Sequence, residues 1–200
     1  GTKDFLSVLD LSSTELTALL DLAARLKRER ALGANAPTRS ALAGKHVALI
    51  FEKPSLRTRA TFEIAVRELG ADALHVPPSS IDGQREPLED IARNLERWVH
   101  GVVLRTFAQA KASAIGAAAS RLHVINALTD EEHPCQALAD FLTLREHHVD
   151  RDVALAVGDD VEDHAAARLA LEPRDLEQEL AEDLAVVAPP LRAERQQVGD

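Results

Sequence analysis

Residues 46–70 read HVALIFEKPSLRTRATFEIAVRELG, and this stretch decides the fold. Its first part, His46–Phe51, is a short apolar run of the kind that forms a buried strand. Residues 55–69 follow with helical spacing of apolar positions, and Gly70 stops the pattern. The stretch therefore predicts a strand that leads into a helix, with hydroxyl and guanidinium groups at the junction.

The junction SLRTR has the chemistry of an anion site. The first turn of a helix exposes unpaired backbone N–H groups and the positive end of the helix dipole, and both favour a bound anion. Arginine adds a planar fork of donors that suits phosphate or carboxylate. Taken alone, however, Arg57 and Arg59 are better explained as solvated charges on a helix surface.

Outward from this stretch, strand and helix patterns alternate along the chain. A capping box formed by Ser12 and Glu15 predicts the start of a further helix. Another helix is expected from Pro134 to about His147. The alternating part predicts strands at His46–Phe51, Ala73–Val76, Gly101–Arg105 and Leu122–Ala127, with helices near 55–69, 86–99 and 109–119. Such alternation predicts an α/β fold, a parallel sheet flanked by helices.

The character of the sequence changes near residue 148. We expect residues 1–148 to form one domain and residues 149–200 to form a partial second α/β unit. Val153–Val157 resembles one more buried strand, but the chain beyond it is acidic and contains Pro173, Pro189 and Pro190. The fold of residues 160–200 is therefore the weakest part of the expectation.

Composition narrows the classes of function. The chain has 200 residues, 46% of them hydrophobic and 28% charged, as in an ordinary globular protein. A formal net charge of −10 argues against a nucleic-acid partner. No apolar run is long enough to predict a membrane span. A single cysteine, Cys135, excludes an internal disulfide and suits the reducing cytoplasm.

Polar groups follow three of the predicted strands. The SLRTR segment follows the first, Arg105 and Thr106 end the third, and His133–Gln136 lies just beyond the fourth. Ligands of open parallel sheets bind outside the carboxyl ends of the strands, so these groups are expected to converge. Each has a simpler explanation, such as a helix cap for His133 or an exposed first-turn position for Gln136. Their shared topology is what favours a site.

Three segments carry a family resemblance: FEKPSLRTRATFE (51–63), REPLEDIARNLER (85–97) and INALTDEEHPCQALADFLTLREH (125–147). Together with Leu104-Arg105-Thr106 they resemble the carbamoyltransferases, and the ornithine branch in particular. The resemblance runs from about Asp4 to His147. Gln84 stands where the aspartate branch carries a catalytic lysine, which also favours the ornithine branch.

The resemblance implies a carbamoyl-phosphate site and assigns roles within it. The phosphate would be held by Ser55, Leu56 through its backbone, Arg57 and Thr58. Arg105 would bridge the phosphate and the carbonyl oxygen, His133 would contact that oxygen, and Gln136 would hold the carbamoyl amino group. Arg105 and His133 would be the catalytic residues.

The resemblance also implies a homotrimer in which one loop reaches the neighbouring subunit's site. This loop is Pro77–Arg85, with Ser79, Ser80 and Gln84 as candidates. Ile81 aligns with the glutamine that the ornithine branch presents there.

The implied reaction is attack of the δ-amino group of ornithine on carbamoyl phosphate, giving citrulline and phosphate without a cofactor or metal. The family's amino-acid domain carries Ser-Met-Gly and His-Cys-Leu-Pro signatures. Neither can occur here, because the chain has no methionine and its one cysteine lies in HPCQ. Two hypotheses remain: an ornithine carbamoyltransferase of arginine biosynthesis, or a non-catalytic, trimer-forming domain that binds carbamoyl phosphate or phosphate. A generic phosphate-binding module is third, since no glycine-rich dinucleotide fingerprint occurs.

Overall fold

The computed structural model describes residues 3–83 and 86–147. Within them lies a four-stranded parallel sheet with the strand order β2-β1-β3-β4. Its strands are β1 (His46–Phe51), β2 (Asp72–Val76), β3 (Gly101–Arg105) and β4 (His123–Leu128). The predicted α/β fold is confirmed for this part of the chain. The boundary near 148, the Val153–Val157 strand and the second unit lie outside the described residues.

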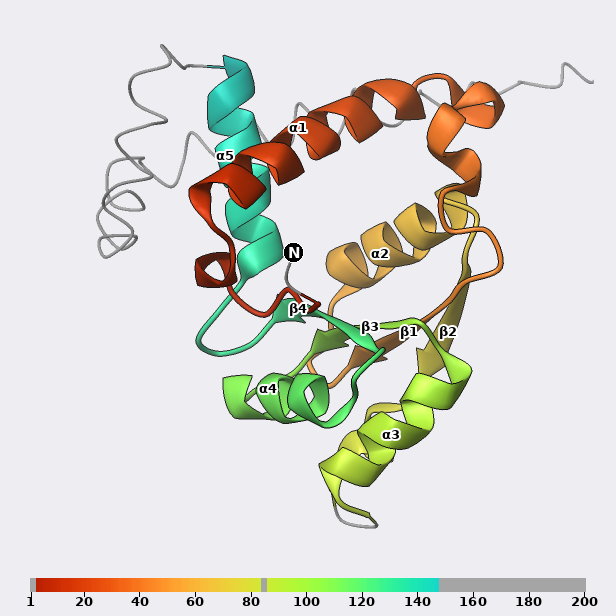
Figure 1. The fold of residues 1–200 in the computed structure, drawn as a ribbon, viewed down its shortest axis with the longest axis vertical. Helices are drawn as coiled ribbons and strands as arrows, with labels where there is room; N and C mark the ends of the chain where they lie inside the picture. Colours follow the sequence, from red (N-terminus) through yellow and green to blue (C-terminus); the bar gives the residue numbers. More distant parts are fainter. Residues whose placement is uncertain (1–2, 84–85, 148–200) are drawn as a thin grey trace, which may run out of the picture. The chain divides into compact units, whose positions relative to one another are not determined.

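Helices cover both faces of the sheet (Figure 1). The helices are α1 (Ser13–Arg30), α2 (Leu56–Glu68), α3 (Leu88–Trp98), α4 (Gln109–Ala118) and α5 (Pro134–His147). Helix α2 lies on one face and α3 and α4 on the other, while α1 packs on α5. The side chains of Ile50 and Leu104 point into the larger core beneath α3 and α4. Leu49 and Val103 point into the smaller core that includes Phe62 of α2.

Most predicted elements agree with the structure to within one or two residues. The capping box at Ser12 is present, with the Glu15 N–H donating to Ser12 Oγ and Glu15 Oε2 accepting from the Ser12 N–H. The backbone hydrogen bond from Ser12 lowers the pKa of Glu15. Residues 31–43 have the glycine, asparagine, proline and serine composition that is typical of a loop, but they contain two short 3-10 helices, Gly33–Asn35 and Pro37–Ser40. Their turns pair backbone groups locally, which a composition of loop-forming residues does not reveal.

One core assignment was wrong. The helical spacing of the predicted helix 86–99 puts Trp98 on the same apolar side as Leu95, but 65% of Trp98 is exposed whereas Leu95 is buried. Trp98 is the last residue of α3, where the chain leaves the helix for β3. The neighbouring Val99 is buried in its place.

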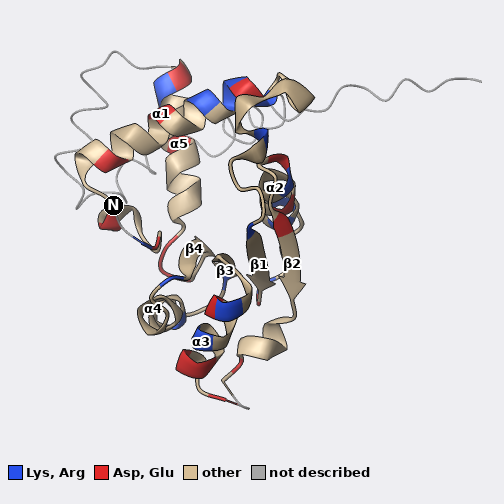
Figure 2. Ribbon diagram, turned by 45° about the vertical axis from the view of Figure 1, so that its right-hand side comes forward, with Lys and Arg blue, Asp and Glu red and all other residues tan. Residues whose placement is uncertain are grey.

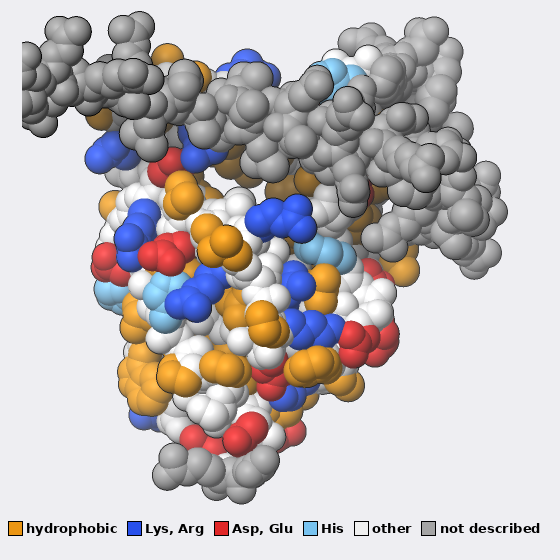
Figure 3. Space-filling view, turned by 180° about the vertical axis from the view of Figure 1, so that it is seen from behind, with side chains coloured by type: hydrophobic (Ala, Val, Ile, Leu, Met, Phe, Trp, Pro, Cys, Tyr) orange, Lys and Arg blue, Asp and Glu red, His pale blue; other side chains and the backbone are white. Residues whose placement is uncertain are grey.

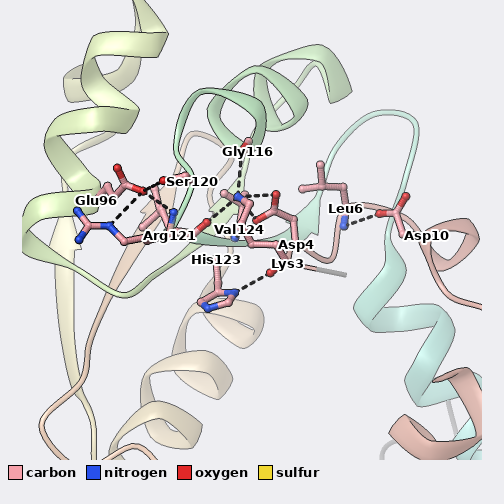
Figure 4. Close-up of polar contacts among 11 residues, drawn as sticks. Lys3, Asp4, Leu6, Asp10, Glu96, Gly116, Ser120, Arg121, His123 and Val124 are labelled. Carbon is pink, nitrogen blue, oxygen red and sulfur yellow. Dashed lines mark hydrogen bonds and ion pairs between the residues drawn. The ribbon is translucent and has the colours of Figure 1, made fainter. Parts of the chain in front are cut away.

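The N-terminal segment extends the sheet beyond β4 (Figure 4). Phe5 forms a parallel bridge with Ile125, and the Phe5 N–H donates to the Val124 carbonyl at 2.8 Å. Lys3 Nζ donates to two backbone carbonyls, those of Gly116 and Leu122. These contacts cover the β4 edge, which would otherwise present unpaired backbone groups.

Charged residues lie mainly on the helices and loops, and most of the length of the strands is uncharged (Figure 2). This distribution follows from burial, because both faces of a parallel sheet are covered. Among residues 3–83 and 86–147, no helix is long and apolar enough to cross a membrane.

Candidate functional site at the carboxyl ends of the strands

The order of the strands locates the site. After β1 the chain turns through α2 to β2 on one side of β1, and then returns through α3 to β3 on the other side. The carboxyl ends of β1 and β3 therefore flank the topological switch point, where open α/β sheets bind ligands. Phe51 and Arg105, the last residues of these two strands, are paired in register.

The first turn of α2 begins at this switch point. Ser55 is the N-cap residue with extended backbone angles, but its side chain makes no capping hydrogen bond. The first turn also contains no acidic residue that would complement the helix dipole. Leu56 is 85% exposed, and Arg57 is exposed without an ion pair or side-chain hydrogen bond to any described residue. Donors and positive charge therefore accumulate here without an anion to balance them.

Arg105 joins this turn from the neighbouring strand. Its side chain lies on the same face of the sheet as α2, because the adjacent Val103 and Leu104 alternate between the two cores. Arg105 Nη1 donates to Thr58 Oγ1 at 3.4 Å, which is a long contact. Its Nε is buried and has no hydrogen-bond partner among residues 3–83 and 86–147. A buried guanidinium N–H without an acceptor is costly, so this geometry favours a ligand that supplies one.

Two ion pairs that the sequence did not predict connect the loops around the site. Glu52 pairs with Lys111 of α4 at 2.6 Å and also accepts a hydrogen bond from Thr106 Oγ1. Lys53 pairs with Asp130 after β4, and its Nζ lies 4.9 Å from the centroid of the Phe107 ring. The sequence indicates these ion pairs only in so far as charged residues directly after an apolar strand need partners. It does not identify which residues, so distant along the chain, those partners are.

His133 and Gln136 lie at the start of α5, beyond the end of β4. The backbone N–H of Gln136 donates to His133 Nδ1 at 3.4 Å, so His133 acts as a helix cap. With Nδ1 accepting, the proton of a neutral ring is on Nε2, which is the tautomer that can donate to a carbonyl oxygen. The Gln136 side chain instead donates to Asp140 Oδ1 at 2.8 Å. A contact between Gln136 and a carbamoyl group would require this hydrogen bond to open.

The Cys135 side chain is largely buried and contacts the backbone of β4. Its Sγ lies 3.5 Å from the carbonyl oxygen of Asn126, and burial raises the pKa of the thiol to about 11. The thiol therefore stays protonated at neutral pH, and a nucleophilic role would need the thiolate. A role as a small packing residue agrees with this environment.

The segment predicted to reach a neighbouring subunit has a fixed anchor. Ser79 and Ser80 are exposed on the 3-10 helix Pro78–Ile81, while Ile81 is fully buried in the larger core. The burial of Ile81 therefore holds the segment against its own subunit. Only the residues next to Ile81 are available for contact with a second chain. Gln84 lies outside the described residues.

Basic and hydrophobic side chains lie side by side on one face of the molecule (Figure 3). Residues 3–83 and 86–147 contain no group of three or more His, Cys, Asp or Glu side chains that could hold a metal ion. The chemistry that the described residues offer at the switch point is hydrogen-bond donation to an oxyanion from hydroxyl, guanidinium and backbone N–H groups.

Comparisons with known proteins agree with this geometry. Residues 3–146 match the family model described as aspartate/ornithine carbamoyltransferase, carbamoyl-P binding domain. The ornithine carbamoyltransferase of Thermus thermophilus is 48% identical over 145 residues, which are 72% of this chain and 46% of that protein. The ornithine carbamoyltransferase of Parafrankia is 50% identical over 145 residues, or 72% of this chain and 45% of that protein.

Solved structures agree as well. The ornithine carbamoyltransferase of Thermus thermophilus gives a TM-score of 0.65 at 47% identity, covering 73% of this chain and 49% of that one. The Pyrococcus furiosus enzyme gives 0.66 at 38% identity, covering 72% and 45%. The chain thus spans about half the length of these relatives. It belongs to the aspartate/ornithine carbamoyltransferase family, and its described residues form the carbamoyl-phosphate-binding domain of that fold.

Proposed function

We propose that this chain binds carbamoyl phosphate at the switch point and takes part in carbamoyl transfer to the δ-amino group of ornithine, giving citrulline and phosphate. The observation that carries the proposal is Arg105, whose guanidinium reaches Thr58 at the α2 N-terminus while its Nε is buried without a partner. Carbamoyl phosphate offers acceptors at both its phosphate and its carbonyl oxygen, so one guanidinium can bridge them.

Each site residue has a specific role in the proposal. Ser55, Arg57, Thr58 and the backbone at Leu56 hold the phosphate. Arg105 and the Nε2–H of His133 donate to the carbonyl oxygen, which becomes an oxyanion when the amine attacks. Donors placed in advance where negative charge develops lower the barrier of such a step. Gln136 would contact the carbamoyl amino group after leaving Asp140.

Assembly and context follow from the same proposal. A homotrimer with a site shared between subunits is part of the proposal, and it requires Leu56 and Ser79–Ser80 to be accessible to a neighbouring copy, which their exposure allows. A role in arginine biosynthesis in the cytoplasm is part of the same proposal, and the relatives named ornithine carbamoyltransferase support ornithine as the acceptor.

Calorimetry with carbamoyl phosphate and with inorganic phosphate tests the binding half of the proposal. We expect saturable heat from both at millimolar concentrations, with tighter binding of carbamoyl phosphate because it also engages Arg105 and His133. No heat from either ligand would contradict the proposal.

A second candidate is a non-catalytic domain that binds carbamoyl phosphate without transferring its carbamoyl group. The observation behind it is that the described residues gather donors for an anion, at Arg105 and in the first turn of α2, and binding alone requires nothing more. A citrulline assay separates the two. Binding without ornithine-dependent citrulline supports the second candidate, and robust citrulline formation excludes it.

A further inference from the structure

A half-buried ion pair lies behind the switch point. Glu52 directly follows β1, and its N–H donates to the carbonyl oxygen of Arg105 at 2.8 Å. Its carboxylate pairs with Lys111 Nζ at 2.6 Å, and the two side chains are only 13% and 21% exposed. Glu52 is therefore held against the same two strand ends that carry the proposed anion site.

A negative charge at this position opposes the proposed ligand. Unit charges repel over several ångströms, and partial burial weakens the screening by salt. Glu52 precedes Ser55 by three residues and is bonded to the end of β3, so its charge lies at the same end of the sheet as the segment that is expected to hold a phosphate. Without a compensating cation, the Glu52 carboxylate would lower the affinity of the site for any anion.

Lys111 supplies that cation from an unfavourable place on its own helix. It lies in the first turn of α4, where the helix dipole disfavours a positive charge. The sequence of α4 gives no local reason for a lysine there, since its first turn contains no acidic residue. The contact with Glu52 is what accounts for its placement.

We propose that Lys111 is a positioning residue of the anion site, which neutralises Glu52 and holds the turn after β1 against the end of β3. The inference rests on the proposed binding of carbamoyl phosphate. It assigns a role in affinity to a lysine that does not itself contact the ligand.

Calorimetry with carbamoyl phosphate on four variants of the full chain tests the inference. Lys111→Met should weaken affinity on the order of tenfold, because it leaves Glu52 uncompensated. Adding Glu52→Gln to Lys111→Met should recover most of the loss, since the opposing charge is then absent. Lys111→Arg should bind like the unaltered chain. Lys3→Met is the control, because it breaks a pair with Asp4 of similar exposure, 30% and 17%, far from the site.

Several outcomes would overturn the inference. If Lys111→Met binds carbamoyl phosphate with unchanged affinity, the inference is wrong but the proposed function stands. If the unaltered chain does not bind carbamoyl phosphate, both are wrong. A double variant no better than Lys111→Met would show that the lysine acts only as a structural clamp. If circular dichroism shows that Lys111→Met does not fold, the double variant decides: affinity near that of the unaltered chain supports charge compensation, and a tenfold loss contradicts it.

Discussion

Polar side chains lie at both ends of the sheet, but their hydrogen bonding differs. At the amino ends the polar groups satisfy one another: His46 Nδ1 lies 3.3 Å from Asp72 Oδ2, and the His46 N–H donates to His100 Nδ1 at 3.2 Å. The His123 ring donates to the Lys3 carbonyl at 2.7 Å (Figure 4). At the carboxyl ends, Arg105 Nε has no partner in the part of the chain that the structure describes, and Ser55 makes no capping bond.

The polarity of the helices explains the difference. In a parallel α/β sheet the helices begin at the carboxyl ends of the strands and end near the amino ends. Helix N-termini present N–H groups and partial positive charge, whereas C-termini present carbonyls and partial negative charge. At the amino ends the imidazole groups find partners in neighbouring strands and loops. At the carboxyl ends Lys53 and Lys111 are paired as well, whereas Arg105 Nε and the first turn of α2 keep donors that suit an anion.

The largest expected effect comes from removing the guanidinium. Arg105→Gln should weaken carbamoyl phosphate binding on the order of 100-fold, because charge-assisted donors to both ends of the ligand are lost. Arg121→Gln is the control at the amino ends, where the Arg121 side chain is 77% exposed and its Nε lies 3.8 Å from Glu96 Oε1, and it should leave affinity unchanged. Calorimetry measures the affinity of both variants. Equal losses of affinity would contradict the difference between the two ends of the sheet.

The second prediction distinguishes an N-cap residue that binds the ligand from one that stabilises its own helix. Ser55→Ala should weaken affinity by about tenfold, the order expected for a hydrogen bond to a charged ligand, with little loss of stability. Ser12→Ala removes a real capping box and should lower the free energy of unfolding by about 1 kcal/mol without changing affinity. Urea unfolding measures the free energy of unfolding, and calorimetry measures the affinity for carbamoyl phosphate. A large loss of stability in Ser55→Ala would count against its assignment to the ligand.

A smaller effect is expected at the amino ends. His100→Leu removes the acceptor of the His46 N–H and should cost at most about 1 kcal/mol of stability, since the site is exposed and water replaces the bond. Affinity for carbamoyl phosphate should stay the same. A change in affinity would show that the two ends are coupled.

The smallest effect depends on pH. The backbone N–H of Arg121 holds the pKa of Glu96 below its ordinary value, so this contact stabilises the fold above the ordinary glutamate pKa. The contribution is lost as the pH falls through the lowered pKa of the folded state. Glu96→Gln should therefore lower the melting temperature slightly at neutral pH, with a difference that shrinks in acid. A difference that grows as the pH falls would have the wrong sign.

Local patterns in the sequence predicted most of the fold. The strand β1, the helix α2 and the cap at Ser12 depend on neighbours along the chain, so periodicity and capping residues were sufficient. The contact between Arg105 and the first turn of α2 agrees with the rule for parallel sheets, and the approach of His133 to them stays a prediction. Trp98 was misplaced because its helix ends at that residue, which helical spacing alone does not show.

The details of the site required the structure. The partners of Glu52 and Lys53 come from other loops and have no signature in the sequence. The burial of Ile81 and the hydrogen bond from Gln136 to Asp140 depend on packing and on side-chain rotation. The family resemblance assigned roles to residues, but it did not say how those residues are held before a ligand arrives.

An NMR titration of the full chain with carbamoyl phosphate tests the central claim most directly, because backbone amide shifts report both ends of the sheet at once. The account predicts saturable shifts at residues 55–58, at Arg105 and near His133, with little change at His46, His100 and His123. Shifts confined to the amino ends, or no shifts at millimolar ligand, would contradict it.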